Sequence, residues 1–318
     1  MERKVATRVG RRHLGFLAGG GLLVLAGCGT GTQAGTPGAP RTAGSSAGAE
    51  FTNPDLKVSV AWLQQHLRDP KVRVVDARPA AEYEKGHIPG AVSLPVADTF
   101  DPGQEKNYPD SKEKLEALLT GKGIGNDVRV IAYDNGRETA GPRLFWTLEY
   151  LGHNNVAVLD GGLKAWQDAK GELTTEAPTV EPATFVSQVD PAKLPTKEQC
   201  EVAIGDPTKV ILDARSPEEY RGEDVRAKFG GHIPGAVNID WRENFTADSL
   251  LKEAPALRTL YESKGVTRDK EVIAHCQTGQ RSSATYWALR LLGYSKVGNY
   301  AGSWVEWGND PDTKKTQG

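Results

Sequence analysis

Residues 272–283 read Val-Ile-Ala-His-Cys-Gln-Thr-Gly-Gln-Arg-Ser-Ser, and this stretch decides how the second half of the chain folds. Its β-branched start is typical of a buried strand, and Gly279 is typical of a tight turn. Residues 284–293 then carry apolar side chains at helical spacing and end in Gly293. The stretch therefore predicts a strand, a short polar loop that contains Cys276, and a helix.

Cys276 is predicted to lie where a thiol becomes reactive. The first N–H groups of the helix and the positive end of its dipole would face the sulfur, and Arg281 would add a permanent cation. Such surroundings lower a thiol pKa from ~8.5 to about 3.5–7.5, so that most of the thiol is ionised at neutral pH. We therefore predict that Cys276 is a nucleophile, and that His275 is structural and either points away from Cys276 or packs under the loop. The predicted anion-binding residues are Gln277, Thr278, Gly279, Gln280 and Arg281.

The folded part of the chain contains one unit twice. Residues 76–83 (Asp-Ala-Arg-Pro-Ala-Ala-Glu-Tyr) recur in similar form as residues 213–220 (Asp-Ala-Arg-Ser-Pro-Glu-Glu-Tyr). The motif Gly-His-Ile-Pro-Gly-Ala-Val at residues 86–92 recurs without change at residues 231–237, after an insertion of eight residues near 222–230. Matching the two copies further along the chain places Asp134 where the second copy has Cys276. The repeat number and period are those of a tandem duplication rather than of a solenoid.

Within each copy, short apolar segments alternate with amphipathic ones. This alternation predicts an α/β fold with two domains, each a parallel sheet with helices on both faces. Ligands of such sheets bind beyond the carboxyl ends of the strands, which is where Cys276 is expected. The predicted strands are 72–75, 128–132, 156–159, 210–212 and 272–274, and the predicted helices include 111–119 and 256–264.

The first 28 residues predict an export signal. A positively charged segment precedes the apolar stretch 14–26, which is too short and too rich in glycine to span a bilayer stably. The stretch ends in Leu-Ala-Gly-Cys at residues 25–28, which resembles the bacterial lipobox, whose cysteine is lipidated. We therefore expect Cys28 to be a lipid anchor that holds the exported protein at the outer face of the cell membrane or in the periplasm. The segment could instead be an ordinary secretory signal with an incidental cysteine. Export could use either the general secretory route or the twin-arginine route.

Composition sets the expected domain boundaries. Residues 29–52, rich in Gly, Thr, Ala, Ser and Pro, predict a flexible tether. The expected domains are 53–177 and 196–310, with a proline-containing linker at 178–195. A net charge of −2 with interspersed signs argues against a nucleic-acid partner or a polybasic membrane surface, so membrane contact would come from the lipid. Three cysteines argue against a disulfide scaffold, and Cys200 is expected to be a packing residue.

Together, the repeated motifs, the cysteine loop and the paired-domain layout resemble the tandem-domain rhodaneses, the thiosulfate and 3-mercaptopyruvate sulfurtransferases. The resemblance covers about residues 53–310. It implies that the second copy is catalytic. The first copy would be inactive, because Asp134 cannot carry a persulfide, and it would help to form the wall of a cleft between the domains. The resemblance also implies that Cys276 takes sulfur from a donor as a persulfide and passes it to cyanide or a thiol, with no metal or organic cofactor.

The resemblance leaves the donor open. The 3-mercaptopyruvate enzymes usually carry a Cys-Gly-x-Gly-x-Thr loop, and this loop has neither the early glycine nor the final threonine, so thiosulfate is favoured. Gln277 stands where many thiosulfate enzymes have a basic residue, and donor affinity is therefore expected to be modest. Arg281 is expected to bind the anionic group of the donor. Arg215 either shares that task or forms a structural ion pair with Asp213.

Two other functions follow from the same residues. A cysteine-dependent phosphatase or arsenate reductase would place five residues between cysteine and arginine, and the four residues here disfavour it. A non-enzymatic persulfide carrier or sensor held at the membrane stays open, because the acceptor usually leaves no local motif. Trp241 and Phe245 are expected to line the cleft beside the site.

Overall fold

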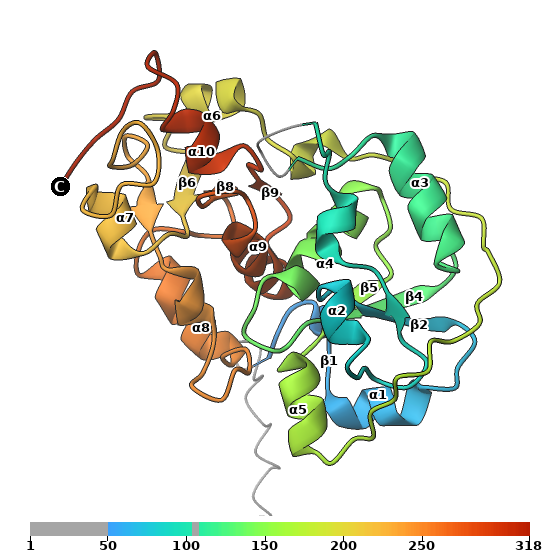
Figure 1. Cartoon of the computed structure of the whole chain (residues 1–318). Coiled ribbons are helices and arrows are strands. Elements are labelled where there is room, and N and C mark those ends of the chain that lie inside the picture. The colour runs from blue at the N-terminus through green and yellow to red at the C-terminus, as the bar shows by residue number, and fades with distance from the viewer. Residues whose placement is uncertain (1–49, 104–107) are drawn as a thin grey trace, which may run out of the picture. The chain divides into compact units, whose positions relative to one another are not determined.

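The computed structural model describes residues 50–103 and 108–318 (Figure 1). The predicted export segment, Cys28 and most of the predicted tether lie in residues 1–49, outside the described residues. Within the described ranges, no helix combines the length and the apolar character that crossing a bilayer requires.

The first domain is a five-stranded parallel sheet in the order β1-β5-β4-β2-β3. Alternate strand residues face opposite sides, because Val75 packs with α3 and α4 whereas Val74 packs with α1 and α5. Helices therefore cover both faces of the sheet. The strands are β1 (Lys57–Val58), β2 (Val72–Asp76), β3 (Val92–Ser93), β4 (Arg129–Tyr133) and β5 (Val156–Leu159). The helices are α1 (Val60–His66), α2 (Ala80–Tyr83), α3 (Lys112–Gly121), α4 (Ala140–Tyr150) and α5 (Gly162–Asp168).

The second domain repeats this plan with a four-stranded parallel sheet in the order β7-β6-β8-β9. Leu212 packs with α8 and α9 on one face, and Ile211 packs with α6 and α10 on the other. The strands are β6 (Lys209–Asp213), β7 (Val237–Asn238), β8 (Glu271–His275) and β9 (Val297–Asn299). The helices are α6 (Lys197–Ala203), α7 (Pro217–Arg221), α8 (Ala254–Glu262), α9 (Arg281–Leu291) and α10 (Ser303–Trp307).

Strand register aligns the two copies residue by residue. Asp76 of β2 pairs with Tyr133 of β4, and Asp213 of β6 pairs with His275 of β8. The residues that follow β4 and β8 are Asp134 and Cys276, so these two side chains hold equivalent positions. One hydrophobic cluster contains core residues of both domains, and α4 packs against α9 where the domains meet (Figure 1).

The structure extends the folded body beyond the expected boundaries. Thr52, placed in the tether, donates from Oγ1 to the Leu292 carbonyl at 3.0 Å. Ser187, placed in the linker, is 6% exposed and donates from its backbone N–H to Glu116 at 2.8 Å. Thr316 exchanges backbone hydrogen bonds with His232. Parts of the expected tether and linker, and residues after 310, therefore pack against the domains, because composition does not reveal which polar segments find partners.

Candidate active site

Cys276 lies between the carboxyl end of β8 and the first residue of α9, Arg281. Its side chain is fully buried, and its backbone N–H donates to Ser303 Oγ at 3.2 Å. Gly279 turns the loop with a φ of +75°, and a Cβ there would lie 2.7 Å from the Ala301 Cα. The loop can therefore close only with glycine at that position.

The surroundings of the sulfur favour the thiolate. Burial alone would raise the pKa of Cys276, but the positive charge of Arg281 and hydrogen bonds from Ser282 and from the Thr278 N–H outweigh burial and lower it. Ser282 Oγ lies 3.5 Å from the sulfur. A lowered pKa is what a cysteine nucleophile requires, and it agrees with the direction predicted from the sequence.

Arg281 is held by a buried carboxylate. Its Nη1 and Nη2 donate to the two carboxylate oxygens of Glu219 on α7, at 2.6 and 2.8 Å. The Glu219 side chain is 1% exposed, whereas that of Arg281 is 22% exposed. The guanidinium is therefore oriented by Glu219 while it still reaches solvent. Glu219 was not predicted as a site residue, although a glutamate occupies this position in both copies of the repeated motif, because the motif does not reveal which side chain it pairs with.

Of the two roles expected for Arg215, the structure shows the ion pair with Asp213, and it turns the side chain away from the donor-binding role. Arg215 is 1% exposed and donates from Nε and Nη2 to Asp213, and from Nη2 to the Gly231 carbonyl at 2.7 Å. Its guanidinium also stacks 4.3 Å from the Trp304 ring. These contacts turn Arg215 into the domain core, and Arg78 forms the same ion pair with its own Asp two residues earlier in the first copy.

The remaining loop residues are only partly buried. Gln277 donates from Nε2 to the Arg226 carbonyl at 2.9 Å, so its amide links the loop to the inserted segment. Gln280 precedes the first residue of α9, without a side-chain capping bond. His275 is fully buried, with Nε2 3.7 Å from Asp213 and Nδ1 3.3 Å from the Cys276 carbonyl, so its ring contacts protein groups.

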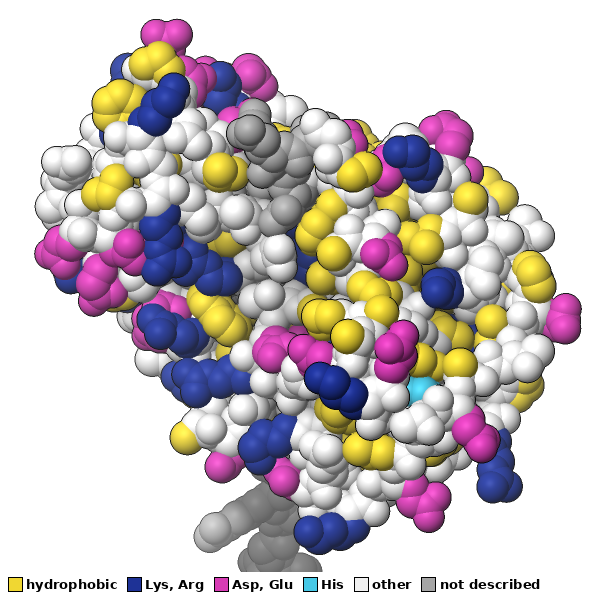
Figure 2. All heavy atoms as spheres, viewed as in Figure 1, with side chains coloured by type: hydrophobic (Ala, Val, Ile, Leu, Met, Phe, Trp, Pro, Cys, Tyr) yellow, Lys and Arg dark blue, Asp and Glu magenta, His cyan; other side chains and the backbone are white. Residues whose placement is uncertain are grey.

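An open hollow of about 430 Å³ lies beside the loop. Three arginines line it, and each is already paired with a carboxylate: Arg281 with Glu219, Arg226 with Asp224, and Arg242 with Asp240. Figure 2 shows Lys and Arg side chains gathered over this part of the second domain, with Asp and Glu beside them. An anion that binds in the hollow must therefore compete with these carboxylates for the arginine side chains. The lining residues are Ser216, Glu218, Glu219, Asp224, Arg226, Trp241, Arg242 and Arg281.

Trp241 lines this hollow as expected, but Phe245 does not. Phe245 is 7% exposed and lines a small cavity together with Asp134 of the first domain. Close by, Leu251 donates its backbone N–H to Asp160 at 2.8 Å. A turn of the second domain thus covers the place where the first domain would have its own site.

Asp134 occupies the cysteine position of the first domain as a buried carboxylate. It accepts backbone N–H groups from Gly136 at 2.8 Å and Gly141 at 2.9 Å. Burial raises the pKa of Asp134 to about 6, against the opposing effect of those hydrogen bonds. A carboxylate cannot accept a transferred sulfur, so Asp134 offers no nucleophile for this chemistry.

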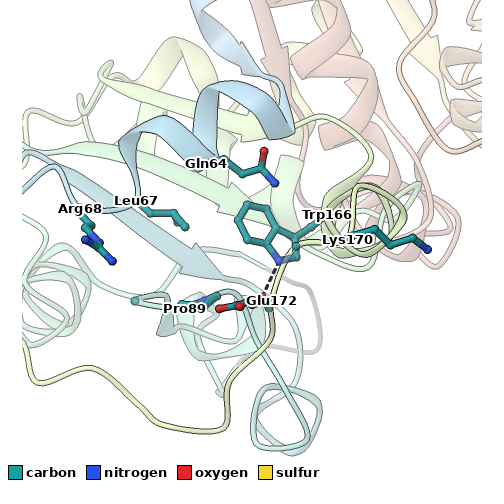
Figure 3. A pocket seen from close by; sticks show the side chains of 9 residues that line it. Gln64, Leu67, Arg68, Pro89, Trp166, Lys170 and Glu172 are labelled. Carbon is teal, nitrogen blue, oxygen red and sulfur yellow. Dashed lines mark hydrogen bonds between the residues drawn. The ribbon is translucent and has the colours of Figure 1, made fainter.

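Neither the other buried cysteine nor the hollow on the first domain provides a nucleophile for a competing site. Cys200 on α6 is fully buried and free, and burial raises its pKa, so it is a packing residue as predicted. A second hollow, of about 470 Å³, lies on the first domain beside Trp166 and Glu172 (Figure 3). No cysteine, serine or histidine lines it. No cluster of three or more metal-ligating side chains occurs in residues 50–103 and 108–318.

The chain matches the family described as Rhodanese-like domain twice, over residues 59–169 and 196–310. It is 36% identical over 265 residues to a thiosulfate sulfurtransferase of Azotobacter vinelandii, covering 83% of this chain and 98% of that protein. It is 36% identical over 281 residues to the sulfur carrier protein TtuD of Thermus thermophilus, covering 81% and 95%. The solved structure of SseA from Escherichia coli, described as a 3-mercaptopyruvate sulfotransferase with the rhodanese fold, superimposes with a TM-score of 0.71 at 29% identity, covering 78% of this chain and 98% of that one.

Proposed function

This chain belongs to the rhodanese family, and on that premise we propose that it is a thiosulfate sulfurtransferase whose nucleophile is Cys276. The observation that carries the proposal is the buried Cys276 thiol with its lowered pKa, between β8 and α9. The equivalent Asp134 of the first domain cannot perform the same step. The relatives named as thiosulfate sulfurtransferases support thiosulfate as the donor.

Sulfur transfer proceeds in two displacements at sulfur. The Cys276 thiolate attacks the outer sulfur of thiosulfate, the S–S bond of the donor breaks, and sulfite leaves with the bonding electron pair. The product is a Cys276 persulfide anion. Cyanide or a thiolate then attacks the outer sulfur of the persulfide, and the Cys276 thiolate is regenerated as the leaving group. Because the enzyme is covalently modified between the two steps, ping-pong kinetics are expected.

The loop supplies the stabilisation that both steps need. Charge moves between Cys276 and the transferred sulfur, close to the Thr278 and Ser282 N–H groups, which stabilise a developing anion without reorganising. Arg281, fixed by Glu219 and still partly exposed, binds the sulfonate end of the donor. Because Glu219 already neutralises much of that charge, donor affinity is modest.

The test is thiocyanate formation from thiosulfate and cyanide by the full chain, with 3-mercaptopyruvate as a parallel donor. Wild type should be active with thiosulfate, Cys276→Ser should fall to the uncatalysed rate, and the buried-cysteine control Cys200→Ser should keep its activity. Activity with 3-mercaptopyruvate alone would contradict the thiosulfate assignment. Activity that survives Cys276→Ser would contradict the assigned nucleophile.

A protein acceptor is a second candidate for the sulfur. The similarity to a protein named sulfur carrier favours it, since that protein is as similar to this chain as the thiosulfate sulfurtransferase is. If the acceptor is a protein, Cys276 forms the same persulfide with sulfur from thiosulfate, but small acceptors such as cyanide remove that sulfur slowly. A persulfide that mass spectrometry detects after thiosulfate treatment, and that persists in cyanide, would support the carrier function over the enzyme.

Export with a lipid anchor is also part of the proposal, and it rests on residues 1–28 alone. The basic segment, the short apolar stretch and the final Leu-Ala-Gly-Cys support lipidation at Cys28. Mass spectrometry of the mature N-terminus after bacterial expression should find a diacylglyceryl-modified Cys28, and Cys28→Ser should release the protein from membranes. An unmodified mature N-terminus at another residue would contradict the anchor.

A further inference from the structure

A buried arginine of the first domain contacts the cysteine loop of the second. Arg143, the fourth residue of α4, is fully buried and donates from Nη1 to the Gly279 carbonyl at 2.7 Å. The fourth residue of α9 is Ala284, whose side chain is too short to make the reciprocal contact. This contact therefore runs from the copy without a cysteine to the copy that has one.

The Gly279 carbonyl is an anchoring point of the loop. Besides Arg143, it accepts Asn299 Nδ2 at 2.8 Å and Ser283 Oγ at 2.9 Å. A carbonyl oxygen has two lone pairs, so three donors fix its direction closely. Because the peptide unit is planar, they also fix the direction of the next N–H group, that of Gln280. Side chains from α4, β9 and α9 together thus set the loop backbone.

The same network leads to the sulfur. Ser282 donates from Oγ to Asn299 Oδ1 at 2.6 Å while lying 3.5 Å from the Cys276 sulfur. A serine hydroxyl has one proton, so Ser282 Oγ can donate either to Asn299 or to the sulfur at any moment, and Asn299 is the nearer acceptor. While the hydroxyl donates to Asn299, the sulfur anion depends more heavily on backbone N–H groups and on nearby positive charge.

Arg143 supplies such a charge from within the protein. Burial lowers the pKa of Arg143 to about 9, and the charge of Cys276 opposes that decrease. The guanidinium therefore stays protonated at neutral pH. An interaction of opposite charges is mutual, so a charged Arg143 must in turn favour the ionised form of Cys276.

Building on the proposed sulfur-transfer function, we propose that Arg143 is a positioning residue for the reaction at Cys276. It holds the Gly279 carbonyl and, as a buried cation, stabilises the Cys276 thiolate and persulfide. The domain in which Asp134 replaces the cysteine therefore contributes directly to the chemistry of the other domain.

The experiment measures the rate of Cys276 alkylation by iodoacetamide against pH, followed by peptide mass spectrometry on the full chain. Arg143→Met should raise the midpoint of the profile by about one pH unit, with a fall of about tenfold in thiosulfate turnover. Arg143→Lys keeps a charge but loses the planar fork, so its midpoint should stay near that of wild type while turnover falls about threefold. The matched control is Arg73→Met, since Arg73 of β2 also donates to a glycine carbonyl, that of Gly123, but within the first domain. Arg73→Met should change neither the midpoint of the alkylation profile nor the thiosulfate turnover.

An unshifted midpoint and unchanged turnover in Arg143→Met would overturn the proposal. If that variant does not fold, wild-type turnover in Arg143→Lys would overturn it instead. A wild-type protein that lacks thiosulfate turnover, but whose alkylation midpoint rises in Arg143→Met, would refute the proposed function and still support the role of Arg143.

Discussion

At the scale of single residues, the two copies differ at the position where the nucleophile lies. Asp134 and Cys276 follow equivalent strands, and both lie in loops whose backbone N–H groups face an anion. In the first copy the anion is a built-in carboxylate, and in the second it is a thiolate that can accept sulfur. The loop thus provides anion stabilisation in both domains, and residue identity alone decides which domain has a nucleophile.

The Glu219–Arg281 pair predicts a pH dependence at this scale. Burial would raise the pKa of Glu219, but hydrogen bonds and charge from Arg281 outweigh it and hold the pKa below its usual value. A depressed carboxyl pKa stabilises the fold above the unfolded value of about 4.3, and the contribution is lost as pH falls through the folded value. Glu219→Gln should therefore destabilise the protein by about 2 kcal/mol at pH 7, and by progressively less as the pH falls below the unfolded value of about 4.3.

Urea unfolding at pH 7 and at pH 3.5 measures this difference. The neighbouring Glu218→Gln is the control, because Glu218 is 55% exposed and its contact with Arg221 is long, at 3.7 Å. It should cost less than about 0.5 kcal/mol at both pH values. A loss in Glu219→Gln that is equal at the two pH values would rule out an ionic origin.

At the scale of elements, the strand–loop–helix unit from β8 to α9 positions Cys276 together with the Arg281 and Ser282 groups that act on its sulfur. The carboxyl end of the strand delivers Cys276, and the start of α9 brings Arg281 and Ser282 within reach of it. The unit closes only because Gly279 adopts a left-handed conformation beside the Ala301 backbone.

Gly279→Ala should therefore impair both the loop and the fold. The left-handed conformation costs a non-glycine residue about 1–2 kcal/mol, and the close Ala301 backbone adds to it. We expect a loss of about 3 kcal/mol in unfolding free energy and at least a tenfold loss in turnover. Gly265→Ala is the matched control, since Gly265 has a φ of +76° with nothing near its absent Cβ. It should lose about 1 kcal/mol and keep full turnover, and equal turnover in the two variants would contradict the assigned role of the loop.

At the scale of the whole described body, the two domains share a polar contact inside their common hydrophobic cluster. Glu149 of α4 is 1% exposed and accepts the Tyr286 hydroxyl at 2.6 Å and Arg290 Nη2 at 2.9 Å, both from α9. This network lies between the same two helices that bring Arg143 to the cysteine loop. Stability of the domain contact and geometry of the site are therefore linked.

Glu149→Gln tests that link. The substitution leaves Arg290 without its carboxylate in a largely buried place and should cost about 3 kcal/mol of unfolding free energy. Calorimetry should show a lower Tm and a broader transition, because the domains then unfold less cooperatively. Asp168→Asn breaks the exposed pair with Lys164 and should shift the Tm little. A sharp transition at the wild-type Tm in Glu149→Gln would contradict a coupling role for this network.

The fold was largely predictable because its signals are local. Strands such as β5 were predicted with the observed bounds, since apolar runs between turn residues depend only on near neighbours in the sequence. Two-residue strands such as β1, β3 and β7 were not predicted, because so short a segment carries no periodicity. Packed segments such as Ser187 were assigned to the linker, because polar composition does not show which backbone groups find partners.

The sequence by itself determined the duplication, the α/β class, and the placement of Cys276 between a strand and a helix. Only the tertiary structure decided that Arg281 pairs with Glu219, that Arg215 turns into the core, and that Arg143 reaches across from the other domain. The physical reason is the range of the interactions. Hydrophobic period and turn residues act over a few positions, whereas the direction of a long charged side chain depends on packing between segments far apart in the chain.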